Sequence, residues 1–138
     1  MMGRRGRTGG IVMLAIAALT VSVASTAARS PTPAEQVALV KAATMYIDRA
    51  ENHCCVHGLR ATAVTSRTRV STAKPGWAIV YVHIKDSLGK QVQGALVVLE
   101  QIHIAWRVKR EGNVFLGCGI PEVVRNDLNL SVPPNGCR

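Results

Sequence analysis

Four histidines and four cysteines are the residues of this chain best suited to chemistry. His53, Cys54, Cys55 and His57 form a cluster with the residue types of metal ligands, and thiolates and imidazoles suit Zn²⁺ or Cu(I). The spacing, however, is not that of a zinc finger or ribbon, and adjacent side chains bind one ion awkwardly. We therefore expect no metal and interpret the cluster as disulfide cysteines flanked by exposed histidines.

The even number of cysteines predicts disulfides if the chain is exported, and three pairings exist. A Cys118–Cys137 bond would link a short C-terminal helix to the tail and contribute about 3 kcal/mol on a loop-entropy estimate. Cys54 and Cys55 would then form a strained adjacent pair or remain free thiols. The alternative bonds Cys54 and Cys55 separately to Cys118 and Cys137 and clamps an N-terminal helix to the tail. We favour Cys118–Cys137 and keep the alternative open.

His83 and His103 fall in segments that we predict to be strands. His83 shares a strand face with Trp77 and Tyr81, while Glu100 lies on the neighbouring strand and, in the expected register, on the opposite face. A histidine, an acid and aromatic rings around a curved sheet would suit general acid–base catalysis, so a small enzyme using His83 or His103 is our alternative. We favour a partly buried histidine that makes one hydrogen bond, and assign no catalytic residue and no cofactor.

Basic side chains on two predicted strands are expected to form a stripe: Arg67, Arg69, Arg107, Lys109 and Arg110. Nucleic-acid binding would require aromatic side chains interleaved with them. Trp106 points to the other side of its strand and the chain is expected to be exported, so we exclude nucleic acid as the partner. An anionic envelope polymer or an acidic protein suits the stripe better.

Residues 1–27 are predicted to be a secretory signal peptide, which leaves 28–138 as one secreted domain. The segment has a basic start, an uncharged apolar run and then small residues, in the order that such signals show: Arg4, Arg5 and Arg7, then 11–24, then 25–28. The apolar run is short for a membrane span. An uncleaved anchor remains the alternative, because the uncharged stretch extends to Ala28. We expect a secreted protein of the extracellular space or the cell envelope.

The basic excess belongs to the domain that follows this signal. Of the 17 Lys and Arg residues, all but Arg4, Arg5 and Arg7 lie beyond it, which leaves 14 against 8 acids and a net charge of +6. Such an excess favours anionic neighbours, although it also serves solubility.

An N-terminal helix is predicted to begin after Thr32 and to end near Asn52. Thr32 suits the N-cap, Pro33 the first helical position and Glu35 the third, which completes a capping box. Apolar residues recur at helical spacing along one side: Leu39, Ala43, Tyr46, Ile47 and Ala50. This pattern predicts an amphipathic helix lying on an apolar surface.

A β-hairpin is predicted at the centre of the domain, with strands over 77–85 and 94–101 and a loop at 86–90. A preceding stretch, 59–70, indicates an edge strand whose arginines discourage pairing with other copies. If 86–90 is the loop, Trp77 lies beside Leu99 on one face of the sheet. Both faces of this hairpin are apolar near its centre.

The alternation of residues continues in phase beyond Gln101, without a glycine or proline. We therefore favour one long bent strand over 94–110, with a tight turn near Gln101 as the alternative. Gly112 and Asn113 indicate a turn, 114–116 a last short strand, and Pro121 the start of a short helix.

Together these segments predict an α+β fold: an N-terminal helix packed on a curved antiparallel sheet of about four strands, with a short C-terminal helix. One helix covers one face of the sheet. The other face needs the C-terminal segment, a ligand or a second subunit, such as a homodimer through that face. We expect a binding pocket or partner surface lined by Trp77, Tyr81 and Leu99.

The C-terminal third resembles a known group of proteins. Trp106-Arg-Val108, followed by Gly117-Cys-Gly-Ile-Pro-Glu-Val-Val-Arg-Asn-Asp-Leu128 and a last cysteine, resembles the ending of small secreted actinobacterial proteins of unassigned function. The resemblance implies a signal peptide, a helix and a few strands, and carries no catalytic residues. The layout is also similar to cystatin-like and nuclear-transport-factor-like α+β folds, which implies architecture alone. Cys54-Cys55 and the longer tail before Cys137 are departures from the group.

Overall fold

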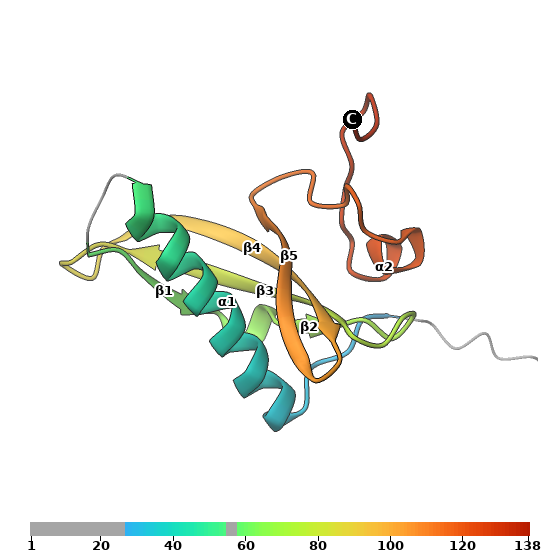
Figure 1. Ribbon diagram of the computed structural model, residues 1–138, viewed down its shortest axis with the longest axis horizontal. Coiled ribbons are helices and arrows are strands. Elements are labelled where there is room, and N and C mark those ends of the chain that lie inside the picture. The colour runs from blue at the N-terminus through green and yellow to red at the C-terminus, as the bar shows by residue number, and fades with distance from the viewer. Residues whose placement is uncertain (1–26, 55–57) are drawn as a thin grey trace, which may run out of the picture.

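The structure, a computed structural model, describes residues 27–54 and 58–138. In chain order its elements are α1 (Pro33–Cys54), β1 (Arg60–Ala63), the 3₁₀ turn η1 (Thr65–Arg67), β2 (Arg69–Val70), β3 (Trp77–Lys85), β4 (Gln91–Ile102), β5 (Ala105–Gly112) and α2 (Glu122–Asp127). Figure 1 shows α1 lying across an antiparallel sheet, with α2 and the C-terminal segment beyond one end of it. The predicted α+β fold is confirmed.

The start of α1 is fixed by the predicted capping box. Glu35 N donates to Thr32 Oγ1 at 3.3 Å, and Thr32 N donates back to Glu35 Oε2 at 2.8 Å. Arg29 adds a bidentate pair to the same carboxylate, with both N–O distances 2.7 Å. The Arg29 guanidinium, with the hydrogen bonds from Thr32, lowers the pKa of Glu35 to about 2. The expected apolar stripe is narrower than predicted, since Leu39, Ala43 and Ile47 are buried whereas Tyr46 and Ala50 are exposed.

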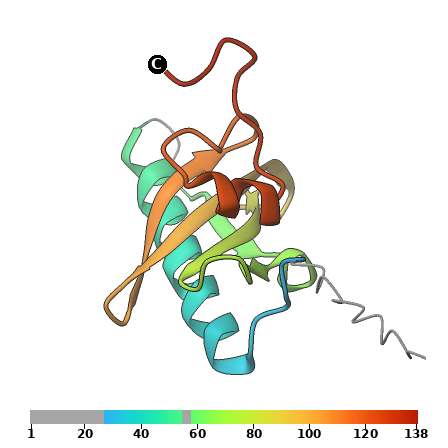
Figure 2. The same ribbon diagram turned by 90° about the vertical axis from the view of Figure 1, so that its right-hand side faces the viewer.

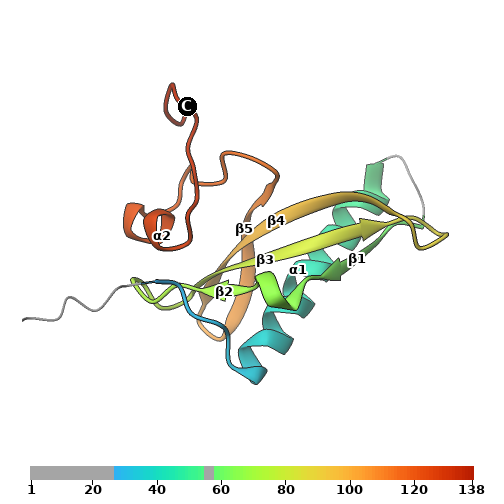
Figure 3. The ribbon, with the colours of Figure 1, turned by 180° about the vertical axis from the view of Figure 1, so that it is seen from behind.

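The sheet has the strand order β1-β3-β4-β5, and β2 also pairs with β3. The predicted edge strand over 59–70 is divided by η1 into β1 and β2, which pair with different parts of β3. Val64 N still donates to Tyr81 O at 2.7 Å between the two pairings. The sheet therefore has five strands but is four strands wide, and Figure 3 shows the curvature of its long central pair.

The β3–β4 register differs from the expected one by a single residue. The loop is as predicted, because Lys85 pairs with Gln91, but a bulge at Val92 brings Gln93 opposite Ile84. Every later pair is shifted, so Leu99 lies opposite Ala78 and Glu100 lies opposite Trp77. Since a shift of one residue exchanges the two faces of a strand, the placement of Leu99 beside Trp77 was wrong.

The single bent strand over 94–110 was also wrong. β4 and β5 form a hairpin in which Ile102 pairs with Ala105, leaving His103 and Ile104 as the turn. His103 has a φ of +57°, in the left-handed region. Histidine is among the residues that adopt this region more often than most. The alternative, a tight turn near Gln101, is what the structure shows; it was ranked second because the segment contains neither glycine nor proline. His103 accordingly lies in a turn and not, as predicted, on a strand.

Two apolar clusters cover the two faces of the sheet. The α1 side holds Leu39, Ala43, Ile47, Val70, Ala78, Val80, Val82, Ile84, Ala95, Val97 and Leu99. The other side is covered at one end by the C-terminal segment, with a cluster of Trp77, Val98, Leu116, Ile120, Val124, Leu128 and Leu130. Figure 2 shows α1 and α2 on opposite sides of the strands. The last strand predicted at 114–116 is a loop instead, and it supplies Leu116 to this second cluster.

Candidate functional site

Trp77 lines none of the three pockets described below for this part of the chain. Its side chain is 4% exposed and packs with the apolar residues of the C-terminal segment. Leu99 is fully buried on the opposite face, under α1. The expected surface of Trp77, Tyr81 and Leu99 is therefore not assembled, because the bulge at Val92 moves Leu99 and the C-terminal segment covers Trp77.

A disulfide and a partly buried carboxylate hold the C-terminal segment in place. Cys118 and Cys137 form the predicted bond, with their Cα atoms 5.4 Å apart. Asp127 Oδ2 accepts hydrogen bonds from Ser71 Oγ and Thr72 N, both at 2.7 Å, and from Ala73 N at 3.1 Å. Burial by itself raises the pKa of Asp127. The hydrogen bonds together lower it by more than burial raises it, so the pKa of Asp127 lies below its ordinary value. α2 is thus tied to the turn that precedes β3.

Tyr81 lies on the same sheet face as Trp77, beyond the end of the C-terminal cluster, and is half-buried. Arg67, which is exposed, stacks on it with Cζ 3.8 Å from the ring centroid. His83 meets the ring at its edge, with centroids 5.3 Å apart and planes at 86°. Gly94 lies beneath the phenol, where a Cβ atom would collide with the Tyr81 hydroxyl. We call Arg67, Tyr81, His83, Lys85 and Gly94 the Tyr81 surface.

The Tyr81 surface is positively charged. Thr62 and Arg60 of β1 pair with His83 and Lys85, and Gly94 pairs with His83 from the other side, so no paired position carries a carboxylate. Asp86 is the acidic residue nearest in sequence to these strand positions, directly after Lys85. It accepts hydrogen bonds from Leu88 N and Lys90 N, both at 2.9 Å, within the hairpin loop. Arg67 therefore has no ion-pair partner among the residues that the structure describes.

The predicted basic stripe is divided into two groups. Arg69 lies beside Arg67 in sequence, but its Nη1 donates to Ser66 O and Thr68 O and is engaged there. On β5, Lys109 Nζ pairs with Glu100 Oε2 at 3.1 Å, and Arg107 lies opposite the same Glu100. Because β3 and β4 separate β2 from β5, the two groups are about 10–15 Å apart.

His83 and His103, the two histidines whose side chains the structure describes, do not form an acid–base pair with each other or with Glu100. His83 pairs with Gly94 and His103 follows Ile102, so the two are about eight residues apart along β4, or roughly 26 Å. Glu100 is on the face of His83 and not, as predicted, on the opposite one, but it lies opposite Trp77, about 20 Å along the strand. Neither histidine lines any of the pockets described next.

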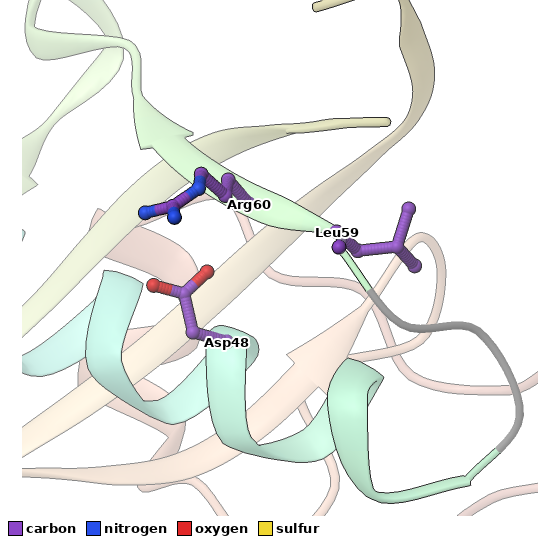
Figure 4. Close-up of a pocket in the computed structure, with 4 residues that line it drawn as sticks. Asp48, Leu59 and Arg60 are labelled. Atoms are coloured by element: carbon purple, nitrogen blue, oxygen red, sulfur yellow. The ribbon is translucent and has the colours of Figure 1, made fainter. Parts of the chain in front are cut away.

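A pocket of about 350 Å³ lies between α1 and β1 and is lined by Asp48, Gly58, Leu59 and Arg60. Figure 4 shows Asp48 and Arg60 pointing into the gap between the two elements and Leu59 pointing away. Asp48 Oδ1 accepts a hydrogen bond from Ala61 N at 2.7 Å, which ties the helix to the edge strand. This carboxylate therefore has a structural role.

Two further hollows lie elsewhere on the surface. One of about 120 Å³ is lined by Leu96, residues 113–116 and residues 129–131. The other, of about 390 Å³, lies between α1 and β5. Within the described ranges, no three His, Cys, Asp or Glu residues gather as a metal site would require. The predictions for the side chains of His53, Cys54, Cys55 and His57 lie outside the described residues.

Sequence reasoning missed two features of these surfaces. Gly94 was taken only as the start of a strand, although a glycine inside an apolar strand often marks a close approach. The groove between α1 and β5 was also missed, because Tyr46 was assigned to the buried stripe of the helix and the turn between β4 and β5 was kept only as an alternative.

Comparisons with protein-family models, with curated protein sequences and with solved structures found no match. The resemblance to small secreted actinobacterial proteins therefore stays a prediction. None of the helices within residues 27–54 and 58–138 is long and apolar enough to span a membrane.

Proposed function

We propose that this protein is a non-catalytic binding module of the extracellular space or the cell envelope, and that its Tyr81 surface takes an anionic group of the partner. The observation that carries the proposal is the exposed guanidinium of Arg67, stacked 3.8 Å above Tyr81 without an ion-pair partner among the described residues. A guanidinium stacked by its face keeps its N–H donors free for a carboxylate or a phosphate.

Export is part of the proposal. The bond between Cys118 and Cys137 supports it, because disulfides persist in oxidising compartments. The expected signal peptide, the net charge of +6 beyond it and the basic Tyr81 surface all favour an anionic envelope polymer or an acidic protein as partner.

We prefer binding to catalysis because the groups for acid–base work are far apart. The ring of His83 meets that of Tyr81, its strand neighbours are Thr62 and Gly94, and its prospective acid, Glu100, is about 20 Å away along the sheet. A homodimer through this face is also less suited, since it would bring the cations of two copies together.

The test measures binding of the purified protein to soluble poly-L-glutamate and to inorganic polyphosphate by isothermal titration calorimetry. Arg67→Ala should weaken binding about tenfold, and the affinity of the unaltered protein should fall with added salt. Lys41→Ala, which removes an exposed charge from α1, is the matched control and should change the affinity less than about twofold.

Gly94→Ala supplies an independent variant, because its Cβ displaces the Tyr81 ring without removing any charge. It should also weaken binding. Equal losses for Arg67→Ala and Lys41→Ala would reduce the effect to net charge and contradict a located site.

A further inference from the structure

The outer edge of β5 carries no neighbouring strand within the described part of the chain. Figure 1 shows β5 as the last strand of the sheet, running beside α1. An open edge exposes main-chain donors and acceptors that can pair with another extended chain. The surroundings of this edge indicate which chain it can take.

The direction of the main-chain groups of β5 follows from the hydrogen bonds of β4. Gln101 N donates to Gly76 O at 2.7 Å, on the side of β4 away from β5. Its pairing with Trp106 is therefore a non-hydrogen-bonded pair, in which the N–H and C=O of Trp106 point to the open edge. The main-chain N–H and C=O of Val108, two residues further, also point to the open edge, whereas those of Arg107 form hydrogen bonds with β4.

A groove of about 390 Å³ follows this edge and is lined by Ala42, Met45, Tyr46, Arg49 and residues 106–108. Met45 is 44% exposed and Tyr46 is 42% exposed, so apolar surface of α1 stays open to solvent here. Trp106 and Val108 pack toward the α1 cluster. Every second side chain of a strand added to β5 would enter this groove.

Beside residues 105–108, the part of β5 before its bulge, the charged side chains without an ion-pair partner among the described residues are positive on both faces. Arg49 lies in the groove, while Arg107 shares the opposite face with Glu100. Glu100 is paired with Lys109, and neither Arg49 nor Arg107 has an ion-pair partner among the described residues. Among the described residues that line the groove, none carries a carboxylate.

We propose that the β5 edge binds an extended acidic segment of another protein by strand addition, with apolar residues entering the α1–β5 groove and acidic residues alternating with them on the side of Arg107. Main-chain bonds to Trp106 and Val108 would hold the segment, and the groove would select its side chains. A second copy of this chain fits poorly, because pairing β5 with itself would place Arg107, Lys109 and Arg110 of both copies together. The bulge between Val98 and Leu99 further confines pairing to about the first four residues of β5.

Amide hydrogen exchange of the purified, isotope-labelled protein tests this proposal directly. The probe is a short peptide in which valine alternates with glutamate. Its binding should slow exchange at Trp106 and Val108 by at least about tenfold, with little change at Arg107, whose N–H is already bonded. Two N-methylated forms of the peptide, blocked on opposite edges, should differ, because only one edge faces β5.

Charge reversal tests the choice of partner. Arg107→Glu should weaken binding of the glutamate peptide about tenfold and allow a peptide of alternating valine and lysine to bind. Lys90→Glu, in the distant hairpin loop, is the matched control and should change neither affinity. Since the test does not use Arg67 or Tyr81, its outcome is separate from that of the proposed function.

Four results would overturn the proposal. The first is binding without alternate protection of Trp106 and Val108, and the second is equal affinity for the lysine and glutamate peptides. The third is protection of the edge that rises with protein concentration in the absence of peptide, which would make a second copy the occupant. The fourth is no binding of either peptide, which would mean that the charges and the bulge serve only to keep copies apart.

Discussion

Trp77 and Tyr81 lie four residues apart on the same face of β3, yet they have different surroundings. Trp77 is 4% exposed beneath the C-terminal segment, whereas Tyr81 is half-buried and contacts Arg67 and His83. Nothing in the alternation of the strand distinguishes the two positions. The cover comes from a segment more than thirty residues away, so the same local pattern yields core at one end and accessible surface at the other.

The comparison is tested most strongly by truncating the two aromatic residues. Trp77→Ala should lower the free energy of unfolding by about 3–5 kcal/mol, since it leaves a cavity in a packed cluster. Tyr81→Ala should cost no more than about half of that, because its ring is partly solvated. Urea unfolding monitored by circular dichroism measures both. Equal losses of unfolding free energy for the two variants would contradict the difference between the surroundings of Trp77 and Tyr81.

Removing the disulfide should loosen the C-terminal segment over Trp77, so that the surroundings of Trp77 become more like the accessible surroundings of Tyr81. Replacing Cys118 and Cys137 with serine should lower the free energy of unfolding by about 3 kcal/mol on the loop-entropy estimate. In a Trp106→Phe background, Trp77 fluorescence should become more accessible to iodide quenching. If quenching stays the same, the apolar contacts of the segment hold the cover without the bond.

The Asp127 carboxylate should contribute less than the disulfide. Asp127→Ala removes the acceptor for Ser71, Thr72 and Ala73, which should cost about 2 kcal/mol. Because the folded pKa of Asp127 is lowered, its contribution is present above the ordinary carboxyl pKa and is lost as the pH falls below it. Urea unfolding at pH 7 and at pH 3 measures this; a difference between wild type and variant that does not shrink in acid would contradict it.

The smallest expected effect is at the start of α1. Arg29 forms a bridge with Val70, and Ala28 packs against the C-terminal cluster, so the Arg29–Glu35 pair supports the Trp77 end. Glu35→Gln should cost about 1 kcal/mol or less, because the pair is partly exposed. With a folded pKa of about 2, this contribution should fade as the pH drops from about 4.5 to 2. Thermal unfolding across that range checks it, and a loss confined to higher pH would contradict it.

The sequence pattern predicted the helices and strands of this fold more reliably than it predicted how the strands pair. Thr32, Pro33 and Glu35 predict the start of α1, and the hairpin loop pairs as expected, because both are set by local chemistry. The bulge at Val92 and the turn at His103 have no such local signal. Both depend on how neighbouring strands align, which the sequence pattern does not show.

The candidate site depended on these less predictable features. Arg67 and Tyr81 were both expected at a binding surface, but their stacking arises only because η1 interrupts the edge strand. Trp77 and Leu99 were expected with them and are core residues on opposite faces. Which of two similar aromatic residues stays accessible was decided by the fold of the C-terminal segment.

The central claim, that the Tyr81 end of this face is the binding surface and the Trp77 end is core, is tested most directly by nuclear magnetic resonance. Soluble poly-L-glutamate is titrated into the isotope-labelled protein, and the amide shifts of both ends of β3 are followed. We predict changes at Arg67, Tyr81 and His83, with Trp77 and Val98 unaffected. Changes centred on Trp77, or shifts spread evenly over the basic residues of the whole molecule, would contradict the account.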